Sequence, residues 1–272
     1  MKPLISEFSY GYAITDELVH GSGSRVQGAP VFPSLYQEGQ PGGGYDVRLN
    51  RVASPLFLQF KLSHYMKTRA AVEHKSGLLS VPCYRFHLMS LKESPQHDLL
   101  CDLEAKGHDV YYVAPAFHKP RELDLAYSNQ TVRRESFWVR PSQIGLLPDR
   151  DPHHVSFLKS KTWAFFSEPE RRETPCDYEA FEARVRSQVA RRRGRRIEQH
   201  EVENLVEDVV SVAESQFPAT EARERPRQVV HRLAASRPLD KVAYLASTYL
   251  DCRVFLVGEG GGISTTSEAP PT

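Results

Sequence analysis

The sequence predicts an α/β protein with a mixed central β-sheet flanked by helices and a C-terminal helical region. Residues 83–114 follow a strand–helix–strand pattern, which favours a mixed sheet with helices packed on it. An apolar strand pattern at 55–62 adds to that sheet, and from residue 177 onward the spacing of apolar residues becomes helical. The composition, 40% hydrophobic and 25% charged, is typical of a globular protein.

The first elements are a helix and a pair of strands. Residues 5–20 predict an amphipathic helix in which Leu4, Phe8, Tyr12 and Val19 fall on one side. A stretch rich in Gly, Pro and Ser at 21–44 indicates a loop. Strands are expected at 45–50 and 55–62, joined by a short hairpin loop, and 63–75 is compatible with a helix.

The middle of the chain continues with alternating elements. Residues 83–89 alternate as a strand, with Tyr84, Phe86 and Leu88 on one face. Residues 94–106 predict a helix with Ser94 as N-cap and Pro95 in its first turn. A buried strand at 109–114 and a helix at 119–128 follow, whereas 135–147 and 153–167 indicate strands or irregular structure.

These patterns divide the chain into three parts. Residues 1–170 form the expected α/β core, and 171–256 form a helical C-terminal region that includes an apolar stripe. The stripe consists of Val202, Leu205, Val206 and Val209. Residues 257–272 are rich in Gly, Ser, Thr and Pro, and we expect them to be a disordered tail.

Charge, cysteine content and hydropathy narrow the class of protein. The formal net charge of +1 gives no general attraction to nucleic acid, so only a local basic patch would do so. The 4 cysteines include no C-x-x-C pair, which indicates free thiols in a reducing compartment. The N-terminal residues lack a signal-peptide pattern, and no apolar run approaches the ~18 residues of a membrane span. We therefore expect a cytoplasmic protein.

The residues that suggest chemistry lie on the strand predicted at 55–62. Because side chains alternate along a strand, Gln59 and Lys61 share one face, whereas Leu58 and Phe60 point to the opposite, buried face. Polar groups on a buried strand need partners. A hairpin register with Asn50 opposite Pro55 would place Asp46 opposite Gln59, with Cβ atoms ~5 Å apart.

Such a group suits a hard cation. Mg²⁺ prefers oxygen ligands, which the Asp46 carboxylate and the Gln59 amide oxygen supply. A bound Mg²⁺ or Mn²⁺ polarises a phosphate and lowers the pKa of its water, and Lys61 would position that water or offset developing charge. The alternative is a surface hairpin with an ordinary salt bridge between Asp46 and Lys61.

The pattern resembles the PD-(D/E)XK, or restriction-endonuclease-like, nuclease superfamily in its Mrr-like variant. There an acid, here Asp46, is followed by Gln-x-Lys, here Gln59 and Lys61, and the glycines at 42–44 also fit. The resemblance implies a further acid from the first helix, for which Glu7 is the first candidate and Glu17 the second. The match covers residues 42–62, and the order of elements fits through residue 114.

One position departs from that pattern, because Tyr45 stands where the superfamily has proline before the acid. The resemblance implies an Mg²⁺- or Mn²⁺-dependent nuclease, acting on duplex DNA, in restriction, phage defence or repair. A homodimer or a partner protein in a multi-component system is compatible with it. The alternative is a catalytically inactive protein of this fold that binds nucleic acid or another protein.

Basic residues outside this group suggest where nucleic acid would bind. His64 and Arg85 lie near the strand and are candidates for contacting a phosphate backbone, although packing at element ends also explains them. The dense basic cluster consists of Arg191, Arg192, Arg193, Arg195 and Arg196. It is compatible with phosphate binding and with a solvated helix end.

Overall fold

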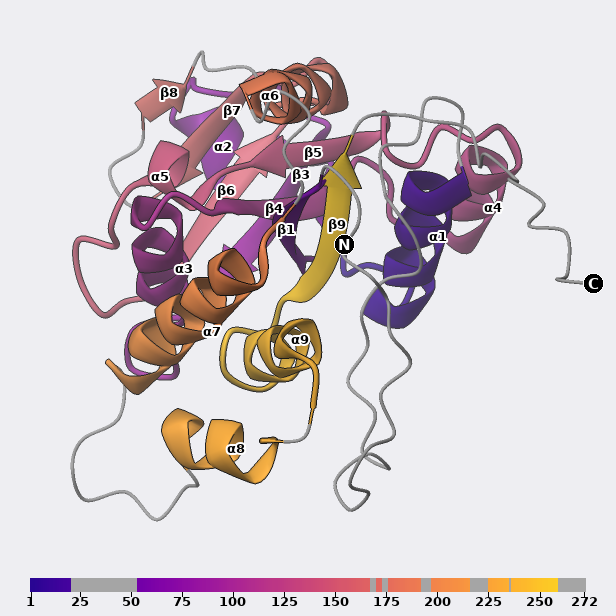
Figure 1. The fold of residues 1–272 in the computed structure, drawn as a ribbon. Helices are drawn as coiled ribbons and strands as arrows, with labels where there is room; N and C mark the ends of the chain where they lie inside the picture. The colour runs from indigo at the N-terminus through magenta and orange to yellow at the C-terminus, as the bar shows by residue number, and fades with distance from the viewer. Residues whose placement is uncertain are drawn as a thin grey trace, which may run out of the picture.

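The computed structural model describes residues 1–20, 53–166, 170–172, 176–191, 197–215, 225–234 and 236–258. It confirms the α/β class. Two β-sheets lie at the centre, and helices cover them on several sides (Figure 1).

The first sheet is mixed and holds the strand that carries Gln59. Its order is β5-β4-β1-β9, with β1 parallel to β4 and antiparallel to β9. The strands are β1 (Ala53–Phe60), β4 (Asp109–Pro115), β5 (Ser136–Val139) and β9 (Arg253–Gly258). The central strand β1 therefore has a neighbour on each edge, and one of these neighbours comes from the far C-terminal part of the chain.

The second sheet is antiparallel, with the order β2-β3-β6-β7-β8. It consists of β2 (His64–Met66), β3 (Cys83–Leu88), β6 (His153–Phe157), β7 (Trp163–Phe166) and β8 (Glu170–Arg172). The helix expected at 63–75 was wrong in its first part, because 64–66 pair with β3 and only α2 (Val72–Lys75) is helical. Cross-strand pairing outweighed the local pattern there.

The two sheets face each other across one hydrophobic core. The rings of Phe137 and Phe157 stack at 4.4 Å between centroids, and those of Phe86 and Tyr112 lie 6.0 Å apart. As predicted, Tyr84, Phe86 and Leu88 all lie on the buried face of β3. This core extends to the helices that pack on the same side of β1.

Helices on the two sides of the first sheet are distinct. The side shared with the second sheet carries α3 (Gln96–Ala105), α7 (Gln199–Glu214) and α9 (Pro238–Tyr249). The other side carries α1 (Glu7–His20), α4 (Pro120–Ser128) and α6 (Tyr178–Arg191), as Figure 1 shows. The shorter helices are α5 (Pro141–Ile144) and α8 (Pro226–Arg232).

The buried side of α1 differs from the prediction. Leu4, Phe8 and Tyr12 are exposed, Phe8 with 84% of its surface accessible. Tyr10 and Ile14 are fully buried instead. The apolar spacing of α1 fits two sides of the helix, and packing against β1 selects the side that carries the small residues as well.

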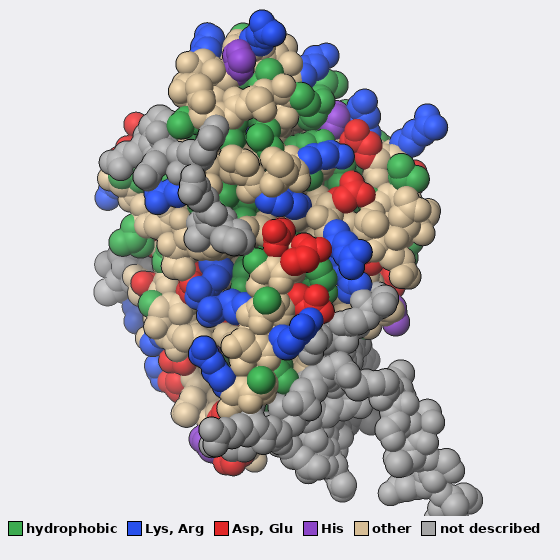
Figure 2. Space-filling model, turned by 90° about the horizontal axis from the view of Figure 1, so that it is seen from above, with side chains coloured by type: hydrophobic (Ala, Val, Ile, Leu, Met, Phe, Trp, Pro, Cys, Tyr) green, Lys and Arg blue, Asp and Glu red, His purple; other side chains and the backbone are tan. Residues whose placement is uncertain are grey.

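The C-terminal region is helical as predicted and also supplies β9 to the first sheet. Val257 and Gly258, placed in the predicted tail, belong to β9, and 259–272 lie outside the described residues. The four cysteines are free. No helix among the described ranges is long and apolar enough to cross a membrane. Figure 2 shows acidic and basic side chains intermixed on the face seen from above.

Candidate functional site

Gln59 and Lys61 lie on the same face at the end of β1, as the period of a strand predicts. Gln59 is 1% exposed, and its neighbours Leu58 and Phe60 are buried on the opposite face. The backbone N–H of Lys61 donates to the carbonyl of Val113 at 2.9 Å, which extends the ladder between β1 and β4 by one residue. The polar pair is therefore fixed by the central sheet.

The carboxylate beside this pair is Asp251. The Gln59 amide Nε2 donates to Asp251 Oδ2 at 2.8 Å. Asp251 precedes β9 with φ of 53°, a left-handed conformation that non-glycine residues seldom adopt. Because β9 runs antiparallel to β1, the start of β9 meets the end of β1. Asp251 is not predicted from the sequence, because no local pattern indicates that a segment 192 residues away pairs with β1.

Asp46, the acid predicted for this position, lies outside the described residues. The hairpin register that led to it needs correction. β1 pairs with β4 from Leu56 to Phe60 and with β9 from Ala53 to Leu58, so both edges are occupied from Leu56 to Leu58. A third strand has no free edge there, because each strand edge forms one ladder.

Gln96, in the first turn of α3, joins the two charged groups. Its Oε1 accepts from Lys61 Nζ at 3.3 Å, and its Nε2 donates to Asp251 Oδ2 at 3.4 Å and to the carbonyl of Leu250 at 3.3 Å. The side chain is buried. The predicted cap at Ser94 is shifted by one residue, since Pro95 is the N-cap and the Ser94 hydroxyl accepts from the Gln96 N–H at 3.2 Å.

Lys61 is a partly buried ammonium between two acids. Burial lowers its pKa, and the charges of Asp251 and Glu7 oppose that shift. Within the described ranges no carboxylate oxygen lies within 4.0 Å of Nζ, so the ammonium has no direct ion pair. It also lies 5.9 Å from the centroid of the Tyr112 ring. The Lys61 ammonium therefore lies near negative charge and forms no direct ion pair with the described carboxylates.

Glu7, predicted as the acid from the first helix, is an exposed residue at the start of α1, and among the described residues no hydrogen bond or ion pair joins it to this group. Partial burial raises its carboxyl pKa first and the negative charge of Asp251 raises it further, whereas Lys61 and Arg253 lower it. The helix comes close to β1 at Gly11. A Cβ there would lie 3.0 Å from the Phe60 ring, a tight contact that would require the ring to shift, so glycine favours this close approach.

The second candidate acid, Glu17, has another role. Its carboxylate is buried and accepts from the backbone N–H groups of Val132 and Arg133 at 2.7 and 2.8 Å. These bonds fix the turn before β5 to α1. Glu17 also lies ten residues beyond Glu7, which is ~15 Å along a helix. It is therefore a structural group, and the candidate role in the site does not apply to it.

The buried rings of His97 and Tyr112 connect α3 to β4 next to the site. The Tyr112 hydroxyl lies 3.0 Å from His97 Nδ1, and His97 Nε2 lies 2.7 Å from the carbonyl of Gly145. Burial lowers the pKa of His97, so the ring is neutral and its Nε2 donates to the carbonyl. Nδ1 then accepts from the Tyr112 hydroxyl. These hydrogen bonds attach α3 to β4 next to Lys61.

The side chains at the end of β1 offer some of the oxygen ligands that a hard cation needs. The Gln59 Oε1 is buried and has no hydrogen-bond partner among the described residues, and such a neutral oxygen is one that Mg²⁺ accepts as a ligand. Asp251 and Glu7 add carboxylates. The described residues nevertheless contain no group of three or more His, Cys, Asp or Glu side chains arranged to hold a metal. Any metal here would rely on the amide oxygen and on water.

The predicted phosphate contacts lie elsewhere. Arg85 makes a bidentate ion pair with the buried Glu73 at 2.7 Å on the outer face of the second sheet, so that carboxylate balances its charge. The His64 ring lies 5.1 Å from that of His87 on the same face. Of the basic cluster, Arg191 ends α6 and is exposed, and Arg192, Arg193, Arg195 and Arg196 lie outside the described residues.

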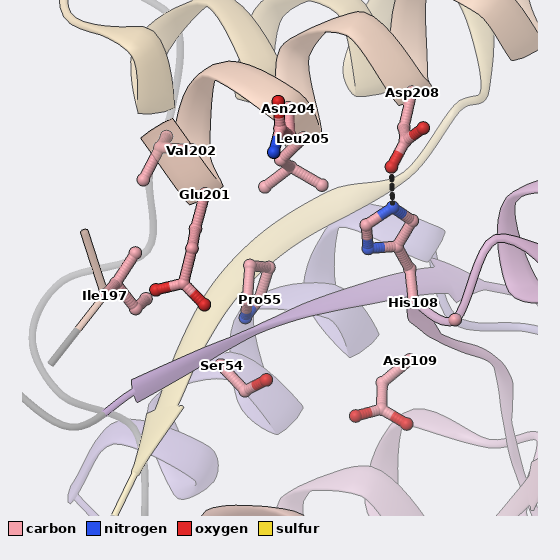
Figure 3. A pocket seen from close by; sticks show the side chains of 11 residues that line it. Ser54, Pro55, His108, Asp109, Ile197, Glu201, Val202, Asn204, Leu205 and Asp208 are labelled. Carbon is pink, nitrogen blue, oxygen red and sulfur yellow. Dashed lines mark hydrogen bonds and ion pairs between the residues drawn. The ribbon is translucent and has the colours of Figure 1, made fainter. Parts of the chain in front are cut away.

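A separate cavity lies at the opposite end of β1 (Figure 3). Its volume is about 280 Å³, and it lies between the starts of β1 and β4 and the helix α7. His108 Nε2 contacts Asp208 Oδ2 at 2.9 Å, and Asp109 is bound by Arg184 at 3.1 Å. Its charged groups therefore have partners within the fold, and the cavity shares no residue with the group around Lys61.

Comparison with known proteins adds no family assignment. No family model, no curated protein and no solved structure matches the chain. The functional argument therefore rests on the geometry at the end of β1.

Proposed function

We propose that this protein is a metal-dependent phosphodiesterase, a nuclease acting on DNA, with its active site at the end of β1. The observation that supports this most is the convergence of Gln59, Lys61 and Asp251 within one hydrogen-bonded group. An acid and an amide oxygen can hold a hard cation, and an ammonium with no direct ion pair among the described residues can offset charge that develops on a phosphate. Glu7 adds a second acid at the edge of the group.

Each side chain has a role in this proposal. Mg²⁺ or Mn²⁺, when bound, supplies a Lewis acid and a water of lowered pKa. Asp251, Glu7 and the amide oxygen of Gln59 would hold it. The Lys61 ammonium then binds a phosphate oxygen and stabilises the charge that develops there.

The test is cleavage of linear and circular duplex DNA, with RNA alongside, in Mg²⁺ or Mn²⁺. We compare the native chain with Lys61→Met and Asp251→Asn. Lys106→Met and Asp208→Asn are matched controls, because these residues form an ion pair at 3.3 Å at the other end of the molecule. Loss of cleavage in the first two variants and not in the controls supports the proposal. Cleavage that survives in all four refutes it.

A second candidate function is a binding module that keeps the fold without turnover. It is favoured by the orientation of Gln59, which turns its Nε2 toward Asp251, and by the absence of a three-ligand metal group within the described ranges. Nucleic-acid binding in EDTA without cleavage in any metal would favour this function. The place in restriction or phage defence, the cytoplasmic location and a homodimer or partner protein remain predictions.

A further inference from the structure

Gln96 occupies the space between the two oppositely charged groups of the site. It is 8% exposed and begins α3, a helix that is separate in sequence from both β1 and β9. Its amide contacts Lys61 through the oxygen and Asp251 through the nitrogen. A third bond, from the nitrogen to the carbonyl of Leu250, fixes the orientation of the amide.

We propose that Gln96 is a positioning residue whose amide separates the Lys61 ammonium from the Asp251 carboxylate and keeps both available to substrate. The hydrogen bonds of Gln96 define this separation, and its importance for catalysis rests on the proposed function.

The chemistry of an amide suits this position. An ammonium only donates hydrogen bonds and an ionised carboxylate only accepts them, whereas an amide both accepts and donates. Gln96 therefore satisfies Lys61 and Asp251 at once. A glutamate of the same shape would keep the acceptor for Lys61 and repel Asp251. An apolar side chain of the same length would satisfy neither group.

Without the amide, the two charges would attract each other into contact. Opposite charges attract each other strongly at close range where water screens them incompletely. Lysine has a flexible four-carbon stem, so its ammonium reaches a nearby carboxylate at little cost. A direct pair would occupy the ammonium that the proposed reaction needs and neutralise the acid. The spacer therefore has a function that simple packing does not explain.

The position of Gln96 is itself fixed. The next residue, His97, bonds to Tyr112 on β4 and to the carbonyl of Gly145, so the first turn of α3 has two further attachments. The amide is consequently presented by a rigid element. A mobile surface glutamine would not hold two charged groups apart.

The first test is a pair of crystal structures, of the native chain and of Gln96→Met, which has a similar length and no polar group. We expect the distance from Lys61 Nζ to the nearest Asp251 oxygen to fall below 4 Å in the variant. In Gln96→Met combined with Asp251→Asn, the lysine should move away again, because the attraction is removed. A lysine that stays apart from Asp251 in Gln96→Met overturns the proposal.

Kinetics provide the second readout. Gln96→Met should lower kcat roughly 100-fold, the scale expected for a misplaced group, with KM changed less than about threefold. Gln96→Glu serves as the second variant should the methionine variant not fold, and it should also lower kcat. Gln199→Met is the matched control, because Gln199 bonds to Glu203 on the surface of α7, and it should cleave as the native chain does. Full kcat in both Gln96 variants overturns the proposal.

The two readouts separate this inference from the proposed function. If Lys61 moves onto Asp251 in the crystal of Gln96→Met while the native chain cleaves no nucleic acid, the positioning role stands and the nuclease proposal fails. If the native chain cleaves and Lys61 does not move, the nuclease proposal stands and the positioning role fails.

Discussion

Replacing Gln59 with glutamate tests whether the end of β1 holds a metal. The change removes the donor that bonds Asp251 Oδ2 at 2.8 Å and places a second carboxylate against the first. Gln59 is 1% exposed, so water cannot screen the new charge effectively. Two carboxylates in contact are the arrangement that a hard cation stabilises and that an empty site does not.

The size of the effect in EDTA follows from the linkage between protonation and folding. Repulsion at this distance exceeds about 4 kcal/mol, so one carboxyl group binds a proton instead. At pH 7, protonating a group of ordinary pKa ~4.3 costs about 3.7 kcal/mol, which limits the loss of unfolding free energy. Because the folded-state pKa is raised, the loss is absent below pH ~4 and grows as the pH rises. For a chain of this size, the loss corresponds to a fall in Tm of roughly 7–15 °C.

The assay is thermal unfolding at pH 7 in EDTA and in Mg²⁺. We expect Mg²⁺ at 100 times its Kd to restore about 2.7 kcal/mol to Gln59→Glu. Gln59→Met is the matched control, since it loses the hydrogen bond to a charged group, worth roughly 1.5–3 kcal/mol, and gains no ligand. If Mg²⁺ raises the Tm of Gln59→Glu no more than that of Gln59→Met, the reasoning that places a metal beside Asp251 is refuted.

Two further predictions concern the support of the site and the second sheet. Gly11→Ala should place a Cβ 3.0 Å from the Phe60 ring. The free energy of unfolding should fall by about 1 kcal/mol, because overpacking outweighs the gain in helix propensity. Because the same helix carries Glu7, its displacement should also lower cleavage ~10-fold. Phe60→Leu in the same chain should restore both quantities, and cleavage unchanged by Gly11→Ala would contradict the role of Glu7. For His154, burial lowers the pKa to about 4, so the unfolded chain binds more protons between pH 4 and 6.5 and stability falls as the pH drops through that window. Between pH 7 and pH 5, urea unfolding should show a loss that is about 2 kcal/mol smaller in His154→Phe than in the native chain. The remaining loss comes from other histidines with a lowered pKa, which are His64, His87, His97 and His118. An equal loss in both proteins would exclude His154 as a source.

The sequence was informative where structure depends on neighbouring residues. The alternation along β1 placed Gln59 and Lys61 on one face, and the two contacts they make confirm it. The start of α3 at Gln96 also followed from local capping signals, within two residues. The resemblance to the nuclease superfamily suggested Glu7 as the acid from the first helix. The charges of Lys61 and Asp251 affect the pKa of Glu7, which is consistent with that suggestion.

Local sequence patterns did not predict which distant strands pair with β1. A hairpin was the simplest neighbour for β1, because strands adjacent in sequence usually pair. The structure pairs β1 with β4 and β9 instead, and no pattern within either segment specifies that choice. The exposed side of α1 was misjudged for the same reason. Packing against Phe60 requires the small Gly11 on the buried side, and that contact exists only in the folded protein.

The origin of Asp251 determines how the site forms. Its carboxylate reaches Gln59 only when β9 has paired with β1 and α9 has packed beside α7. Gln96 reaches both Lys61 and Asp251 only when α3 is attached to β4 through His97. The groups of the site thus come from three elements that are far apart in the chain. Gln59 and Lys61 come from the end of β1, Gln96 from α3, and Asp251 from the segment before β9. If the proposed function holds, activity would depend on the pairing of β9 with β1, because the segment before β9 supplies the acid.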